Sequence, residues 1–225
     1  MKSADAVMTY GKSKEFLKTI GCKNIEKHDV KISPEFNPNG EQFGWFDKTK
    51  RKILFLGKPT KYKGIIQLLE AFRNIKDGRY HLYIFGQKDA REYQRLCNDR
   101  VFFNPAIAPW SVPKILRSID LFVAPECFFG VQNHTSRIPL EAILCGANTL
   151  ISEEIAEKYP YKELKGLFTE INPLKIDEFT KRIIENSENP KKVDLSDKQK
   201  QFINEIRNFD GYLLEMEGIF NRYAK

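Results

Sequence analysis

Short apolar runs alternate along the chain with stretches that have the spacing of amphipathic helices. Runs that are apolar at successive positions are typical of strands buried on both faces of a parallel sheet. We expect such strands at residues 53–57, 80–86, 101–103, 121–124 and 149–151, with an edge strand at 166–168. We expect the helices between and after them at residues 65–75, 89–97, 112–119, 139–145, 155–159 and 174–185, with Ser111 as the cap of the helix at 112–119. This alternation predicts an α/β fold with a doubly wound parallel sheet.

The two ends of the chain have a different pattern. Short strands are expected at residues 4–10 and 28–32, with a helix at 13–20 between them. One long helix is expected over residues 196–223, with an inner apolar face that packs against residues 4–20 or a partner chain. That face holds Leu213, Met216, Ile219, Phe220 and Tyr223. We therefore expect an N-terminal appendage with a linker rich in proline, glycine and asparagine, a main domain and a C-terminal helix, over residues 1–44, 45–190 and 191–225.

Polar residues gather where two of the expected inner strands end. Lys58 and Lys63 flank the loop after the first of these strands, and Thr135, Ser136 and Arg137 precede the helix after the fourth. Ligands of open parallel sheets bind at the carboxyl ends of the strands, and the free N–H groups of a helix start favour anions. These residues therefore predict a seat for a diphosphate. The alternative is that the lysines are solvated side chains of a surface loop.

Glu141 lies one turn inside the helix that follows this seat. A carboxylate at that place suits the hydroxyls of a ribose, so the two features together suit a ribonucleoside diphosphate. A sugar linked through a diphosphate is cleaved when negative charge on the leaving group is stabilised. Positioned cations and amides provide this stabilisation without a metal.

Composition narrows the class of protein. Of 225 residues 41% are hydrophobic and 30% are charged, and the polar, interrupted first twenty residues predict no secretory signal. The cysteines show no paired or metal-binding spacing, so we expect them to be reduced in a cytoplasmic protein without a metal or cofactor. The net charge of +7 suits phosphates or peripheral contact with an anionic membrane, or only a solvated surface. The lysines are spread along the chain, which argues against nucleic acid.

Three segments resemble a known family. The sequence PLEAILCGANTLIS resembles the pattern P-L-E-A-(M/I)-x-C-G-x-x-(V/L)-I-(A/S) of the large retaining glycosyltransferase family with a two-domain B-type fold. The loop that ends in Lys63 and Gly64 resembles its G-R-x-x-x-x-K-G segment. Residues 4–21 are similar to the end of its N-terminal acceptor domain. The resemblance implies a Rossmann-like, donor-binding C-terminal half, with most of the acceptor domain missing.

The resemblance also implies roles for single residues. Lys58 and Lys63 would bind the diphosphate, Glu141 would grip the ribose hydroxyls, and Ala106 and Ile107 would lie beside the base. An ordinary connection between a strand and a helix is the alternative for the loop of Ala106 and Ile107. Lys58 stands where the family has arginine, so the charge is kept but the bidentate fork is lost.

The sugar-facing glutamate of the family is a further departure. It stands eight positions before the glutamate of the helix, which is Asn133 in this chain. Either Asn133 takes its place, or Glu126 reaches the sugar through the longer loop. Lys63 and one of these two residues are the expected catalytic groups.

We therefore expect a glycosyltransferase of the hexosyltransferase type. It would move a sugar from a nucleotide-diphosphate donor, with retention and without a metal, to a glycan, lipid or protein acceptor. The alternative is a non-catalytic nucleotide-sugar-binding subunit or remnant that needs an acceptor-binding partner, or a cleft rebuilt by self-association. A generic doubly wound regulatory or nucleic-acid-binding domain is a third class, and it predicts no binding of nucleoside diphosphates.

Overall fold

The structure is a computed structural model of the chain. It describes residues 7–9, 17–19, 21–27, 30–87, 89, 91–127, 136–189 and 195–223. The described residues form two compact units. The larger lies between Glu35 and Asp194, and the smaller combines the two ends of the chain, Met1–Pro34 and Leu195–Lys225.

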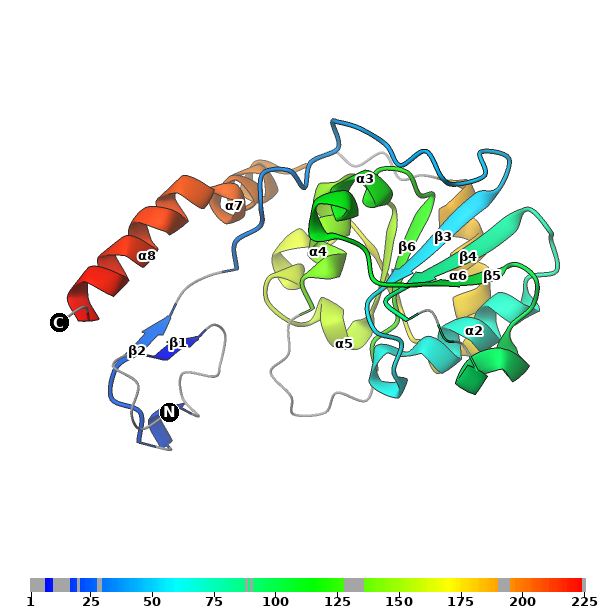
Figure 1. Ribbon diagram of the computed structural model, residues 1–225, viewed down its shortest axis with the longest axis horizontal. Helices are drawn as coiled ribbons and strands as arrows, with labels where there is room; N and C mark the ends of the chain where they lie inside the picture. The colour runs from blue at the N-terminus through cyan, green and yellow to red at the C-terminus, as the bar shows by residue number, and fades with distance from the viewer. Residues whose placement is uncertain are drawn as a thin grey trace. The chain divides into compact units, whose positions relative to one another are not determined.

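A six-stranded, entirely parallel sheet forms the centre of the larger unit (Figure 1). Its strands are β3 (Arg51–Leu56), β4 (Tyr80–Phe85), β5 (Val101–Asn104), β6 (Leu121–Ala124), β7 (Thr149–Ser152) and β8 (Thr169–Ile171). The strand order is β5-β4-β3-β6-β7-β8, so the direction of winding reverses between β3 and β6. The predicted doubly wound α/β sheet is thereby confirmed.

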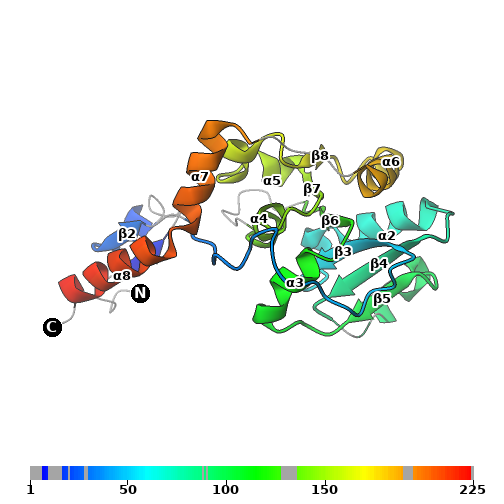
Figure 2. The same cartoon turned by 90° about the horizontal axis from the view of Figure 1, so that it is seen from above.

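Helices cover both faces of this sheet (Figure 2). The α-helices of the larger unit are α2 (Ile65–Asn74), α3 (Val112–Leu116), α4 (Ile138–Leu144), α5 (Glu153–Ala156) and α6 (Ile176–Glu188). Short 3-10 helices join them, which are η1 (Lys61–Lys63), η2 (Arg91–Leu96), η3 (Pro109–Ser111) and η4 (Tyr161–Leu164). Helices α2 and α6, which are distant in sequence, pack against each other.

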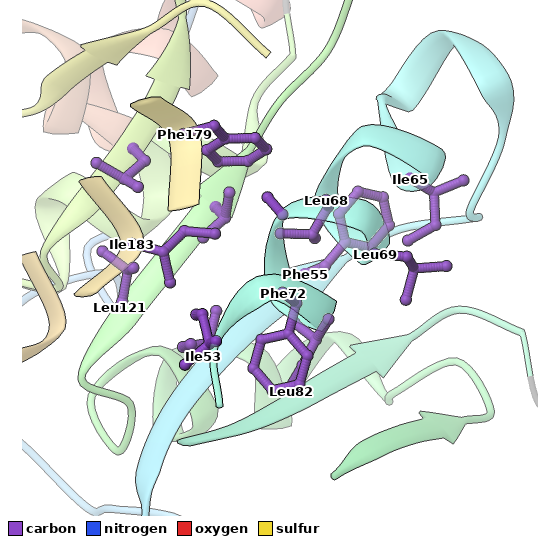
Figure 3. Close-up of a cluster of buried hydrophobic side chains, with 14 of the residues drawn as sticks. Ile53, Phe55, Ile65, Leu68, Leu69, Phe72, Leu82, Leu121, Phe179 and Ile183 are labelled. Carbon is purple, nitrogen blue, oxygen red and sulfur yellow. The ribbon is translucent and has the colours of Figure 1, made fainter. Parts of the chain in front are cut away.

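The main hydrophobic core lies between these two helices and the sheet (Figure 3). Phe72 of α2 and Phe179 of α6 point into it, and both are almost completely buried. Ile53 and Phe55 of β3 face the same core, since alternate residues of a strand share a face. Each such side chain contributes about 1.5–3 kcal/mol to folding by leaving water.

Aromatic residues between the linker and β3 cover the other face of the sheet beside β4. Phe46 is buried, and its ring centroid lies 4.7 Å from that of Tyr83. Phe102 of β5 stacks on Tyr83, with the two ring centroids 5.2 Å apart. The segment between the linker and β3 is therefore packed against the sheet.

Arg117, which directly follows α3, fixes the start of the linker. Its guanidinium donates hydrogen bonds to the carbonyl oxygens of Glu35 at 2.6 Å, Asn37 at 2.8 Å and Glu41 at 3.1 Å. Hydrogen bonds from a charged donor are stronger than neutral ones. The polar segment that the sequence marked as a linker is thus held on the larger unit.

The smaller unit contains a parallel pair of short strands, β1 (Val7–Thr9) and β2 (Ile25–Lys27). The strand expected at residues 28–32 is wrong for residues 30–32, which have no strand structure. The Ile32 N–H instead donates to the carbonyl oxygen of Ile206 at 2.9 Å. Contact with the end of a helix thus replaces strand pairing here.

The expectation of one long C-terminal helix is also wrong. Two helices are present, α7 (Asp197–Arg207) and α8 (Phe209–Tyr223). Asn208 causes the break, because its backbone leaves the helical region and its side chain accepts the Gly211 N–H at 2.9 Å, as an N-cap does. The expected inner face of α8 is only partly buried, since Ile219 is 4% exposed whereas Leu213 is 51% and Phe220 is 63% exposed.

Three other local predictions differ from the structure. Residues 91–96 form a 3-10 helix instead of an α-helix, because the Asp89 side chain accepts the Arg91 N–H and competes for the backbone. The edge strand begins at Thr169 because Gly166, with φ of +95°, forms a turn. Ser111 makes no capping hydrogen bond to α3, since the η3 turn leads directly into that helix. None of the described helices has the length and apolarity needed to cross a membrane.

Candidate functional site

The carboxyl ends of β3 and β6 lie side by side at the point where the winding of the sheet reverses. The loop after β3 and the first turn of α4 meet at this edge, because a Cβ placed on Gly57 would lie 3.8 Å from Cδ1 of Ile138. In open parallel sheets this edge forms the ligand crevice. The structure thus brings together the two connections in which the sequence placed its candidate residues.

Lys63 and Glu126 join these two connections by an ion pair. Glu126 follows β6 and is only 4% exposed, whereas the Lys63 side chain is 24% exposed. The Cys127 N–H donates to the carbonyl oxygen of Tyr62 at 3.0 Å, which fixes the backbones to each other. The β3–α2 loop is therefore anchored to the end of β6.

Gly64 permits this close approach. Its φ is +68°, and a Cβ there would lie 1.9 Å from the carbonyl oxygen of Pro125. Only glycine fits between the α2 start and that carbonyl group. The glycine of the Lys63-Gly64 pair therefore has a structural role that the sequence motif alone did not disclose.

Glu141 lies in the first turn of α4 and is half-buried. Burial raises the pKa of its carboxyl group above the usual value, and the positive charge of Arg137 partly opposes this shift. Arg137 itself is exposed at the N-cap position of α4. The first turn of α4 therefore carries a poorly hydrated carboxylate beside a cation.

Tyr161 of η4 is hydrogen-bonded to the backbone at the start of α4. Its side chain is completely buried, and the hydroxyl donates to the carbonyl oxygen of Ser136 while it accepts the Leu140 N–H at 3.1 Å. Burial raises the pKa of Tyr161 well above its usual value, and the charges of Glu126 and Glu141 act in the same direction. Both carboxylates are thus close enough to influence the start of α4.

This contact limits the anion seat that the sequence predicted at the start of α4. Pro139 has no N–H, and the Leu140 N–H is taken by Tyr161. Among the first three residues of α4, only Ile138 has a backbone N–H that donates no hydrogen bond to another described residue. Side-chain cations would therefore have to supply most of the attraction for an anion at this edge.

Lys58 is exposed and lies at the rim of a groove of about 650 Å³ beside the same loop. The walls of the groove come from the β3–α2 loop, the start of α2, the loop after β4, and η2. They consist of Lys58, Pro59, Thr60, Lys61, Ile66, Gln87, Glu92, Tyr93 and Leu96. The Tyr93 hydroxyl donates to the carbonyl oxygen of Pro59 at 3.1 Å and so fixes the loop to η2.

The remaining predicted site residues differ in exposure, and two of them are not described. Ser136 is buried, with 5% exposed. Ala106 is exposed and Ile107 partly buried, in the segment between β5 and η3. Asn133 and Thr135 lie outside the described residues. Within the described ranges no group of three or more His, Cys, Asp and Glu side chains is placed to hold a metal ion.

Sequence reasoning missed two contributors to this site. No motif marked Tyr161, because it reaches α4 from a 3-10 turn later in the chain. Cys127 is buried next to the ion pair, and burial, with the charges of Glu154 and Glu126, raises the pKa of its thiol to about 11. A thiol of this kind stays protonated and packs as a small apolar group.

The strand order and the two joined connections define an α/β domain of the Rossmann-like class, with its candidate ligand edge at the point of reversal. The chain belongs to the family described as glycosyl transferases group 1, whose model matches residues 40–209. Among curated protein sequences, none matches the chain.

Solved structures share the fold at low sequence identity. Sucrose-phosphate synthase from Thermosynechococcus elongatus has 15% identity and a TM-score of 0.65, over 98% of this chain and 58% of that one. WaaG, a glycosyltransferase involved in lipopolysaccharide biosynthesis, has 16% identity and a TM-score of 0.59, over 89% and 62%. S. aureus TarM, in complex with UDP among other ligands, has 16% identity and a TM-score of 0.59, over 99% and 42%. The chain thus spans less than two thirds of each of these proteins.

Proposed function

We propose that this chain is the donor-binding part of a glycosyltransferase that uses a nucleotide-diphosphate sugar. Family membership supports glycosyl transfer as the reaction class. The structure with bound UDP among the similar folds supports a nucleoside diphosphate as the leaving group. Retention of anomeric configuration and independence of metal are part of this proposal.

The observation that carries the proposal is the anchoring of the β3–α2 loop to the end of β6. Through it, the Lys63 ammonium and the first turn of α4 belong to one edge of the sheet. Lys58 and Lys63 would bind the diphosphate as point charges, and Ser136 and Arg137 would approach it from the segment just before α4. Thr135 is proposed for the same role. Positive charge at this place stabilises the diphosphate as the bond to the sugar breaks.

The remaining roles concern the two ends of the donor. Glu141 would accept hydrogen bonds from the ribose hydroxyls, for which its position one turn into α4 is suitable. Ala106 and Ile107 would lie beside the base. Asn133 is proposed to face the sugar.

Binding experiments test the proposal directly. Thermal-shift and calorimetric titrations would compare uridine, guanosine and adenosine diphosphates and their sugar conjugates. We expect one diphosphate to raise the melting temperature, since a ligand that binds only the folded state stabilises it. The absence of binding to every nucleoside diphosphate would contradict the proposal and favour a generic doubly wound domain.

A second candidate is a nucleotide-sugar-binding subunit without activity of its own. Asn133, which stands where the family has its sugar-facing glutamate, favours it. An assay for donor hydrolysis and transfer by the isolated chain separates the two. Binding without turnover, followed by turnover when an acceptor-binding partner is added, would identify the subunit.

A further inference from the structure

Glu126 is a buried carboxylate whose charge has a partner in Lys63. Only 4% of the residue is exposed, and its Oε1 contacts the Lys63 ammonium. A carboxylate removed from water is costly unless a cation and hydrogen bonds compensate it. The ion pair therefore holds the Lys63 side chain at one place before any ligand arrives.

The backbone around Glu126 cannot easily move away. The Cys127 N–H is bonded to the Tyr62 carbonyl oxygen, and the Pro125 carbonyl group lies against the α-carbon of Gly64. The lysine has a long, flexible stem, and 24% of its side chain is accessible. A ligand that competes for this pair would therefore move the ammonium group more readily than the carboxylate.

The charge of Glu126 extends to the edge where the diphosphate is proposed to lie. After burial, that charge is among the causes that raise the pKa of Tyr161, whose hydroxyl contacts the first turn of α4. It also contributes to the raised pKa of Cys127. A diphosphate at the same edge would therefore compete with Glu126 for the Lys63 ammonium group.

We infer that Glu126 is the internal counter-ion of Lys63, and that a nucleoside diphosphate must displace Glu126 as the partner of the Lys63 ammonium group. In this role Glu126 is a positioning residue that orients the ammonium group in the empty site and weakens anion binding. It does not contact the sugar. This inference rests on the proposed function, and it answers which of the two candidates, Asn133 or Glu126, is left to face the sugar.

Calorimetry with inorganic pyrophosphate and with UDP tests the inference. Glu126→Gln keeps the size and an acceptor oxygen but removes the charge, so pyrophosphate should bind at least about threefold tighter. In the Lys63→Ala background the same change should bring no gain, because the effect acts through Lys63. Glu178→Gln is the matched control, since it also removes a carboxylate paired with a lysine, Lys175, and should leave pyrophosphate binding unchanged.

Other outcomes would overturn the inference. A sugar-facing Glu126 predicts that Glu126→Gln weakens only the sugar conjugate and leaves pyrophosphate unchanged. A gain that persists without Lys63 would mean direct repulsion of the ligand. Glu126→Met, which fills the same volume without charge, repeats the test if Glu126→Gln does not fold. If the unchanged protein binds neither pyrophosphate nor any nucleoside diphosphate, the proposed function fails as well. If the wild-type protein binds these ligands but neither Glu126 variant binds pyrophosphate more tightly, only the inference fails.

Discussion

The α-carbon of Gly64 lies against the carbonyl oxygen of Pro125, so that a Cβ at Gly64 would lie 1.9 Å from that oxygen. Gly64→Ala must therefore separate the β3–α2 loop from the end of β6. We expect a loss of about 2 kcal/mol or more in the free energy of unfolding, measured by urea denaturation. Gly166→Ala is the matched control, since Gly166 also has positive φ but open space around it, and should cost about 1 kcal/mol.

The double variant Lys58→Ala/Lys63→Ala should weaken nucleoside diphosphate binding by more than about tenfold, because each charged contact contributes about 1.5–3 kcal/mol. Calorimetry measures the change. Lys181→Ala/Arg182→Ala removes the same net charge from the middle of α6 and serves as the control. Equal affinities in the two double variants would remove these lysines from the site.

Glu141→Gln should affect stability and binding in opposite directions. Burial raises the pKa of Glu141 in the folded protein above the ordinary 4.5, so the ionised carboxylate opposes folding at neutral pH. Its cost is absent well below pH 4.5 and is fully present once the pH has passed the raised pKa. The variant should therefore have a higher free energy of unfolding than the wild-type protein at pH 7, and this difference should vanish on acidification.

The same variant should bind nucleoside diphosphates more weakly if Glu141 holds the ribose. Inorganic pyrophosphate, which has no ribose, should be much less affected. Equal changes for both ligands would exclude the ribose role. Chemical denaturation at two pH values and calorimetry at pH 7 provide the measurements.

Tyr161→Phe should destabilise the larger unit and loosen the first turn of α4. The change leaves both the Ser136 carbonyl group and the Leu140 N–H without a buried partner, at about 1–3 kcal/mol each. Tyr80→Phe is the control, because the Tyr80 hydroxyl donates to Glu188, whose side chain is 36% exposed and can return to water. A similar loss in both variants, measured by urea denaturation, would contradict this role of Tyr161.

The sequence predicted the inner strands well because their apolar runs leave few alternatives. The run at residues 121–124 became β6 with the same bounds, and residues 65–75 became α2 with one residue fewer. The errors lie where a single polar group decides the backbone. Asn208 divides the final helix through its own side chain, and no periodicity reveals such a cap in advance.

The sequence predicted only the part of the site that follows from which strands are neighbours in the sheet. The reversal point follows from the strand order, so the meeting of the two loops could be expected. The partner of Lys63 could not, because whether Glu126 points inward or outward depends on how Pro125 and Gly64 pack. In the same way, Tyr161 occupies an amide that sequence reasoning had counted as available to an anion.

The central pair of the sheet, β3 and β6, consists of strands far apart in the chain. The Lys52 N–H of β3 bonds to the Asp120 side chain at 2.7 Å across a separation of 68 residues. During synthesis on the ribosome, one long edge of β3 thus stays without its neighbour until that later stretch has emerged. Exposed strand edges of this kind pair wrongly with other chains, and such distant contacts form slowly. Newly made chains should therefore be most prone to aggregate in that interval, and a chaperone that shields β3 should raise the yield of folded protein.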